Sequence, residues 1–266
     1  MTNSISHFLA VDIILQPSHS SRLKRHNKGY QPISYIEQYE QKNQKQKTLL
    51  AFLIFNLYFN DQIRIYRNWA FAMEKRLKQE SKQLIKVVLF GPESTGKTTL
   101  SRQLAAHYNT LCTPEFLREF AQNKWDKEQK RCEEKDIIKI AQGQMHLENE
   151  SAKTANQILI CDTDLLETKV YAEAYFEGFN LPELNQAIAN NHYELYCLTY
   201  IDTPWEADDL RDRAELREQM FIQFEAALIT HKKRYVLLKG DKTTRLKNAI
   251  NYIDQLLTEK VHKRHN

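Results

Sequence analysis

Cysteine is scarce in this chain of 266 residues, and its spacing suits neither a disulfide framework nor a zinc site. No two cysteines form a C-x-x-C pair, and the four lie far apart, at Cys112, Cys132, Cys161 and Cys197. Structural zinc sites and small disulfide-rich domains both depend on close or paired spacing. No signal-peptide pattern opens the chain either. We therefore expect reduced thiols and a cytoplasmic protein.

Apolar runs long enough to cross a membrane are also missing. Residues 49–59 are apolar except for Asn56, and this run falls well short of the roughly 20 residues that span a bilayer as a helix. It suits a buried element or an interfacial segment between basic flanks. Residues 1–72 contain no phosphate loop and no H-x-G-H adenylyltransferase signature, and a polar run fills 38–47. We interpret them as a poorly ordered or loosely docked extension of a domain at 73–266.

The positive charge of the chain belongs to this extension. Residues 1–72 hold nine Lys and Arg against four Asp and Glu, whereas the remainder holds 29 against 30. The domain is therefore not basic, and we expect no nucleic-acid partner. The length of the chain leaves room for one sizeable α/β domain with an appendage.

One glycine-bearing loop carries the clearest functional signal. Residues 91–99 (GPESTGKTT) fit the pattern G-x-x-x-x-G-K-[ST], after an apolar run at 84–90 and before helical spacing at 100–108. A strand, such a loop and a helix N-terminus together direct backbone N–H groups at phosphate oxygens. Lys97 is expected to reach the β- and γ-phosphates of ATP, and the Thr98 hydroxyl to ligate Mg²⁺. The expected nucleotide-binding residues are Gly91, Glu93, Ser94, Thr95, Gly96, Lys97, Thr98 and Thr99.

From residue 84 onward, strand and helix patterns alternate. This order predicts a doubly wound α/β fold with a mainly parallel, five-stranded sheet, as in phosphate-loop (P-loop) NTPases and nucleoside kinases. The expected strands are 84–90, 110–113, 157–161, 193–201 and 235–238. The expected helices are 100–108, 115–123, 133–153, 165–176, 212–231 and 243–257.

The third strand ends in a carboxylate, as a Walker B element does. Asp162 or Asp164 would then hold the Mg²⁺ shell beside Thr98. Thr163 follows Asp162 where a hydrolytic motor usually has Glu, and this favours a transferase. Residues 123–126 spell the guanine motif N-K-x-D of GTPases. They follow a helical pattern close to the phosphate loop, and the chain has no D-x-x-G switch, so a guanine-binding role is disfavoured.

Two further charged clusters suit phosphoryl transfer. Glu115 begins the segment after the second strand, where a carboxylate could take the proton of a substrate hydroxyl, with Arg118 close by. Residues 205–213, after the fourth strand, carry Arg211 and Arg213 and could close over the phosphates as a lid. Each cluster also fits a plainer interpretation, namely an acidic first helical turn and a solvated ion-pair face.

Four segments follow one another in the order GPESTGKTTL, PEFLREF, ILICDTD and DTPWEADDLRDRAELRE. With this order, residues 84–257 resemble the ribosylnicotinamide kinase domain of NadR-type proteins, within the AAA-like P-loop families. The resemblance implies transfer of the ATP γ-phosphate to the 5′-hydroxyl of nicotinamide riboside, giving nicotinamide mononucleotide for NAD synthesis. The adenylyltransferase half of bifunctional members is missing, so the reaction is expected to stop at the mononucleotide. Another nucleoside or small-metabolite kinase, and a nucleotide-dependent switch with little turnover, are the alternatives.

The resemblance also implies roles for individual residues. Family members often carry an aromatic residue where this chain has Pro114, so the group that stacks on nicotinamide is taken from Phe116, Tyr171 and Tyr175. The implied catalytic residues are Lys97, Glu115, Arg118, Asp162, Arg211 and Arg213, with Thr98 and Asp162 at the metal. The implied substrate-binding residues are Glu115, Phe116, Asp164, Tyr171, Tyr175, Trp205 and Asp209.

Overall fold

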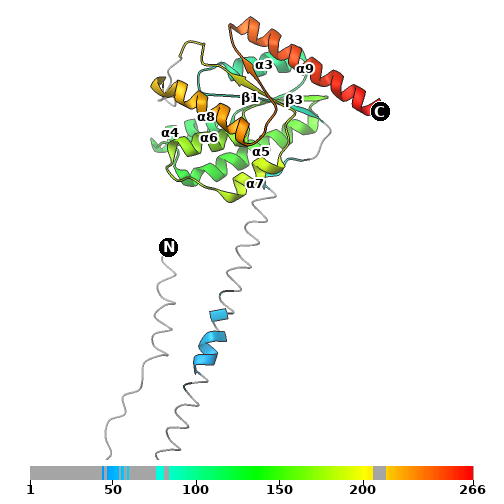
Figure 1. Cartoon of the computed structure of the whole chain (residues 1–266). Helices are drawn as coiled ribbons and strands as arrows, with labels where there is room; N and C mark the ends of the chain where they lie inside the picture. Colours follow the sequence, from blue (N-terminus) through cyan, green and yellow to red (C-terminus); the bar gives the residue numbers. More distant parts are fainter. Residues whose placement is uncertain are drawn as a thin grey trace, which may run out of the picture. The chain divides into compact units, whose positions relative to one another are not determined.

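We describe the protein from a computed structural model, shown in Figure 1. The structure describes residues 44, 47–53, 55, 56, 59, 76–80, 84–205 and 214–265. The chain divides into two units, Met1–Trp69 and Ala70–Asn266. Most of the first unit, and with it the expectation of a poorly ordered or loosely docked extension, lies outside the described residues. No helix among the described residues is long and apolar enough to cross a membrane.

The helical residues described in the first unit expose large apolar side chains. Residues 47–53 are helical, and the Thr48 hydroxyl donates to the carbonyl of Gln44 at 2.9 Å. The exposed apolar side chains are Leu49, Leu50, Phe52, Leu53, Phe55 and Phe59. The sequence suggested either a buried element or an interfacial segment for this run, and burial is not observed for these side chains.

A five-stranded, fully parallel sheet forms the centre of the second unit, in the order β2-β3-β1-β4-β5. Its strands are β1 (Ile85–Phe90), β2 (Cys112–Thr113), β3 (Ile158–Asp162), β4 (Leu195–Thr199) and β5 (Tyr235–Leu238). The chain adds β2 and β3 on one side of β1 and then crosses to add β4 and β5 on the other. Ligands of such sheets bind at the carboxyl ends of the strands near this reversal.

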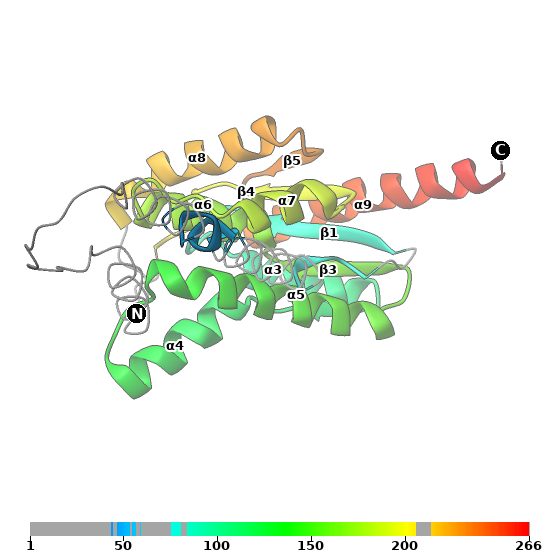
Figure 2. The same cartoon turned by 90° about the horizontal axis from the view of Figure 1, so that it is seen from below.

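Helices cover both faces of the sheet, as expected for a doubly wound fold (Figures 1 and 2). One face carries α3 (Lys97–His107) and α9 (Lys242–His265). The opposite face carries α5 (Ile137–Thr154), α6 (Leu165–Tyr175), α7 (Pro182–Asn190) and α8 (Arg217–Thr230). The remaining helix, α4 (Phe116–Glu128), follows β2 and packs beside α5.

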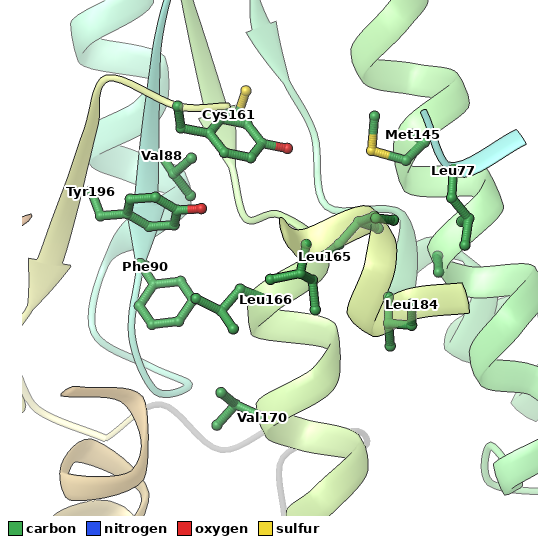
Figure 3. Packing of buried hydrophobic residues seen from close by; sticks show 14 of the residues in the cluster. Leu77, Val88, Phe90, Met145, Cys161, Leu165, Leu166, Val170, Leu184 and Tyr196 are labelled. Atoms are coloured by element: carbon green, nitrogen blue, oxygen red, sulfur yellow. The ribbon is translucent and has the colours of Figure 1, made fainter. Parts of the chain in front are cut away.

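Two separate apolar cores result from this layering. Side chains alternate along a strand, so Val87 and Leu89 of β1 pack with α3 and α9, whereas Val88 and Phe90 face the other helices. Figure 3 shows Phe90 close to Leu166 and to the α6 side of this second core. Both faces of the sheet are covered, which is why the strands read as continuous apolar runs.

Several predicted elements differ in detail from the observed ones. The helix expected at 133–153 begins with a 3₁₀ turn, Glu134–Asp136, because Glu133 and Asp136 form a reciprocal capping box there. The strand expected at 110–113 has only two paired residues. The helix expected at 115–123 continues to Glu128, and the closing helix reaches His265 rather than stopping at 257.

One helix, α7, was missed altogether. It is short, and Pro182 occupies its first turn, a common helix-start position. Only Leu184, Ala187 and Ile188 of its nine residues are buried. Three apolar positions over two turns give only a weak helical periodicity. From the sequence alone, the segment therefore looks like a loop between two elements.

A short segment before β1 closes the amino-terminal side of the second unit. Leu77 is fully buried, and the Asn191 side chain donates to its carbonyl at 3.0 Å. The Gln79 amide donates to Asn191 Oδ1 at 3.1 Å, and its side chain donates to buried Glu148 at 2.8 Å. We call residues 76–80 the amino-terminal clasp.

Candidate active site

The phosphate loop has the backbone shape that glycines permit. Gly91 has a φ of 139°, and a Cβ added there would lie 2.8 Å from Thr199 Oγ1 and 2.9 Å from the Thr199 carbonyl oxygen. Gly96, with a φ of 80°, is the N-cap of α3 and makes no side-chain cap. The first turn of α3 has no acidic residue. The N–H groups and positive end of this helix are therefore suited to an anion such as phosphate.

Hydrogen bonds brace the loop against the end of β4. Thr95, nearly fully buried, bonds through its hydroxyl to the carbonyl of Pro92 at 2.8 Å and to Thr199 Oγ1 at 2.7 Å. Behind the loop, the first turn of α3 leaves Thr98 and Thr99 exposed to solvent. The expected phosphate-binding residues thus form one rigid loop with an open helix N-terminus.

A buried arginine on α9 supports the same loop from behind. Arg245, 3% exposed, donates to the Thr95 carbonyl at 2.5 Å and to the Tyr200 carbonyl at 2.8 Å. It also donates to the Gly240 carbonyl at 2.9 Å and pairs with Asp202. Arg245 therefore ties the loop to the ends of β4 and β5. No sequence motif marks Arg245, because its partners lie far from it in the chain.

Lys97 is held by groups of the protein itself. Its ammonium donates to the Gly91 carbonyl at 2.6 Å and to the Pro92 carbonyl at 3.0 Å. The same nitrogen lies 3.1 Å from Glu167 Oε1 of α6, and Glu167 is 1% exposed. Glu167 was also missed by the sequence analysis. Its only sequence signal is a charged residue among the apolar positions of a helix start.

Three carboxylates surround Lys97. Burial opposes its charge, but Glu167, Glu115 and Asp162 outweigh burial and raise the pKa of Lys97. The pKa of Glu167 is raised to about 8, and burial is the largest cause. The negative charges of Glu115 and Asp162 act in the same direction, and together these effects exceed the opposing effect of Lys97. The folded site therefore holds a proton on Glu167 more tightly than water does.

Asp162 and Thr98 meet as the sequence predicts. Asp162 ends β3 and is 2% exposed, and burial raises the pKa of its carboxyl. A hydrogen bond from Thr98 and the charges of Lys97, Arg102 and Arg118 act in the opposite direction. A carboxylate and a hydroxyl are hard oxygen ligands, so the pair fits Mg²⁺ held together with nucleotide phosphates.

Asp164 lies elsewhere than the sequence analysis expects. It is the N-cap of α6 and accepts from the Glu167 amide at 3.1 Å, while its other oxygen accepts from the Tyr196 hydroxyl at 2.6 Å. Burial raises its pKa to about 6. Between the two aspartates, Thr163 has a φ of 100°, an unfavourable value for a β-branched residue. This turn sends Asp162 to the site and Asp164 into the core, away from the expected metal and ribose edge.

Glu115 occupies the N-cap position of α4 without capping it. Its side chain makes no cap hydrogen bond, and its charge instead acts on Lys97 and Glu167. The positive charge of Arg118, one turn along α4, offsets part of the rise in the pKa of Asp162 that burial causes. The structure therefore brings Glu115, Arg118, Asp162 and Lys97 to one place from three separate segments of the sequence.

The three aromatic candidates take different positions. Phe116 packs against Gly143 of α5, and its ring centroid lies 6.1 Å from that of Phe120. Tyr171 is packed edge-on against Phe224, at 5.2 Å between centroids, so its ring is part of the core. Its buried hydroxyl has no hydrogen-bond partner within the described part of the chain. Tyr175, one turn further along α6, is 38% exposed.

Trp205 lies beside the phosphate loop. The guanidinium of Arg217 is 5.6 Å from the centre of its ring and donates to the Thr203 carbonyl at 3.0 Å. Thr203 in turn donates to the carbonyl of the loop residue Ser94 at 2.7 Å. Trp205 is thus linked to the phosphate loop through Arg217 and Thr203, and its assignment to the substrate stays a prediction. Asp209, Arg211 and Arg213 lie outside the described residues.

Comparisons with known proteins agree with this geometry. A family model described as an AAA domain matches residues 86–245, which is more than half of the chain. The trifunctional NAD biosynthesis/regulator protein NadR of Salmonella typhimurium is 32% identical over 125 residues, which cover 47% of this chain and 30% of that protein. The Escherichia coli protein of the same name gives the same identity and coverage. The chain thus matches less than a third of the length of these curated relatives.

Solved structures show the same relationship. A crystal structure of NadR protein in complex with NR is 25% identical, with a TM-score of 0.56 over 65% of this chain and 50% of that chain. NadR in complex with NAD and AMP-PNP has a TM-score of 0.54 at 22% identity, with coverage of 65% and 49%. A deoxyadenosine kinase of M. mycoides, at 15% identity and a TM-score of 0.50, shares the fold. The chain belongs to the AAA-domain family of P-loop proteins, and it has the nucleoside-kinase-like fold that it shares with NadR.

Proposed function

We propose that this protein transfers the γ-phosphoryl group of Mg-ATP to the 5′-hydroxyl of nicotinamide riboside, giving ADP and nicotinamide mononucleotide. The observation that carries the proposal is the position of Glu115. This carboxylate starts α4, makes no capping bond, and acts electrostatically on the phosphate-loop lysine. A carboxylate beside that lysine is where an acceptor hydroxyl needs a base. The likeness to NadR in complex with NR supports the choice of acceptor.

Each group near Lys97 has a defined task in this reaction. The oxygen of the acceptor hydroxyl forms a bond to the γ-phosphorus, the bond from that phosphorus to the bridging oxygen breaks, and the hydroxyl proton passes to Glu115. Lys97 stabilises charge on the phosphates, and Arg118 holds the acceptor end. Arg211 and Arg213 would close the lid over the phosphates. Thr98 and Asp162 would hold Mg²⁺, which would supply positive charge to the phosphates.

We place the acceptor between the start of α4 and α6, because Glu115 and Tyr171 lie close enough to interact electrostatically. Phe116 and Tyr175 are the stacking candidates for the nicotinamide ring, because the ring of Tyr171 already packs against Phe224. The buried hydroxyl of Tyr171 would bond to the acceptor instead. The four cysteines are free thiols, in keeping with a cytoplasmic reaction.

A panel of acceptors tests the proposal. ADP release is measured with nicotinamide riboside, thymidine, deoxyadenosine and cytidine, and products are identified by mass spectrometry. We expect nicotinamide riboside to give the highest kcat/KM and a product heavier by one phosphate group. Preferential turnover of a deoxynucleoside would instead establish the related kinase. Tight Mg-ATP binding without turnover of any acceptor would favour a nucleotide-dependent switch.

A further inference from the structure

The first turn of α4 needs support from outside the helix. None of the α4 residues is fully buried, although Leu117 and Phe120 pack against the core with part of their surface. The first N–H groups of a helix have no partner within it and are usually satisfied by the side chain at the N-cap. Glu115 holds that position and makes no such bond.

Gln144 of α5 satisfies the first of these N–H groups. Its side chain is 1% exposed, and its Oε1 accepts from the Phe116 amide at 2.8 Å. Its Nε2 donates to the carbonyl of Pro114 at 3.3 Å. One side-chain amide therefore holds the backbone on both sides of Glu115. An amide is suited to this because it is both donor and acceptor.

The preceding residue, Gly143, gives the acceptor segment room to sit this close to α5. A Cβ at position 143 would lie 2.2 Å from Cε1 of Phe116 and 2.4 Å from Cδ1 and Cζ of the same ring. Real Cβ atoms do not approach ring carbons this closely, so a larger residue would displace the ring or the helix start. Gly143 and Gln144 thus act on adjoining parts of one short segment, residues 114–116.

We propose that Gln144 and Gly143 are positioning residues for phosphoryl transfer. Because Gln144 holds the backbone on both sides of Glu115, and Glu115 makes no capping bond, its carboxylate is kept close enough to act on Lys97. Because Gly143 admits the Phe116 ring, the backbone of Glu115 stays within reach of the acceptor hydroxyl. This inference rests on the proposed role of Glu115 as the base. It concerns orientation, since small misplacements of a reacting group can cost about 10²-fold in rate.

The structural part of the proposal is tested without catalysis. Hydrogen–deuterium exchange is measured over residues 114–120 in the full chain and in Gln144→Met, which keeps the side-chain length but loses both bonds. We expect exchange of the amides at the start of α4 to rise about tenfold. Ile140→Val, one turn earlier on α5 and equally buried, is the control for a general loss of packing. Unchanged exchange in Gln144→Met would overturn the positioning role.

The functional part is tested by a double-mutant cycle with Glu115→Gln. With the acceptor that wild type uses best, Gln144→Met should lower kcat about 10- to 100-fold and leave the KM for ATP within about twofold. In the Glu115→Gln background the same change should have almost no further effect, because the group that it misplaces is already disabled. Multiplicative losses would show that Gln144 acts independently of Glu115 and would sink the proposal.

Gly143→Ala provides a second, independent variant. It leaves Gln144 in place but pushes on the Phe116 ring, so both kcat and the KM for the acceptor should worsen while ATP binding is retained. Wild-type kinetics in Gly143→Ala would contradict its role. If wild type phosphorylates no acceptor in the panel, the proposed function fails, and the exchange measurement alone decides whether Gln144 positions the segment.

Discussion

The carboxylate of Glu167 lies 3.1 Å from the ammonium of Lys97, and both side chains are almost completely enclosed. The phosphate-loop lysine is thus paired within the protein by a residue of α6, as well as by two carbonyls of its own loop. A triphosphate entering the site must compete with these partners. The pair links the nucleotide loop to the helix that borders the proposed acceptor pocket.

Replacing Lys97 should abolish phosphoryl transfer without unfolding the protein. Lys97→Ala removes positive charge where the bridging oxygen becomes negative, an interaction that counts mainly in the transition state. It also leaves Glu167 buried without its partner, so the free energy of unfolding should fall. The additional change Glu167→Gln should restore stability but not turnover. Activity is followed by ADP release and stability by urea unfolding. Restored turnover in the double variant would contradict a catalytic role for Lys97.

The stability of the protein should depend on the protonation of Glu167. Its pKa is raised from an ordinary value near 4.5 to about 8, so the folded state binds this proton more tightly than the unfolded state. The associated stability is complete below about pH 4.5 and is lost as the pH rises through about 8.

Glu167→Gln should remove this component. Urea unfolding between pH 6 and pH 9 should show a shallower fall in the free energy of unfolding than in wild type. Glu177→Gln, at an exposed position two residues after the end of α6, is the matched control and should follow wild type. Identical pH profiles for all three proteins would mean that Glu167 does not titrate in this range.

The role of Glu115 as base is tested by Glu115→Gln. The amide keeps the shape and the hydrogen-bonding reach but cannot take the proton, so kcat should fall about 10²- to 10⁴-fold. The affinity for ATP should change little, because Glu115 would face the acceptor. If Glu115 is only a favourable charge near a helix N-terminus, stability should drop by about 0.3–1 kcal/mol and turnover should survive. Steady-state kinetics and nucleotide titration distinguish the two outcomes.

Arg245 should be required for a stable nucleotide loop. Arg245→Met removes the ion-pair partner of Asp202, which keeps its bond from the Gly240 amide, and takes this donor from three carbonyls, which should cost about 1–3 kcal/mol of stability. Nucleotide affinity should fall with it, measured by titration at a temperature where the variant is folded. The matched control is Arg234→Met, since Arg234 pairs with Glu259 on the surface and should cost about 1 kcal/mol or less. Equal losses in the two variants would argue against a special role for Arg245.

The amino-terminal clasp should mark how far the chain can be shortened. The fragment 73–266 keeps Leu77 and Gln79 and should retain the kinetics and ATP affinity of the full chain. The fragment 81–266 loses a buried leucine and leaves Glu148 and Asn191 with fewer partners, so its melting temperature should drop clearly. Loss of ATP binding already in 73–266 would show that the preceding residues complete the site.

Local patterns were sufficient to predict the sheet and the phosphate loop, but they left open which of Asp162 and Asp164 lies beside Thr98. A strand, a glycine turn and a helix start are short-range features, since each depends on residues within about ten positions of one another. The carboxyl ends of parallel strands also meet at one edge, so Asp162 and Glu115 could be assigned to the same region before the structure was known. The chain's motif order likewise determined its family.

Tertiary structure alone decided which neighbours those residues have. A strained backbone at Thr163 separates Asp162 from Asp164, and core packing against Phe224 takes the ring of Tyr171 out of the stacking candidates. Glu167, Gln144 and Arg245 have no motif that marks them, because their importance lies in contacts with residues 28 to 150 positions away. Pair interactions of this kind depend on distance in space, and a sequence pattern records only distance along the chain.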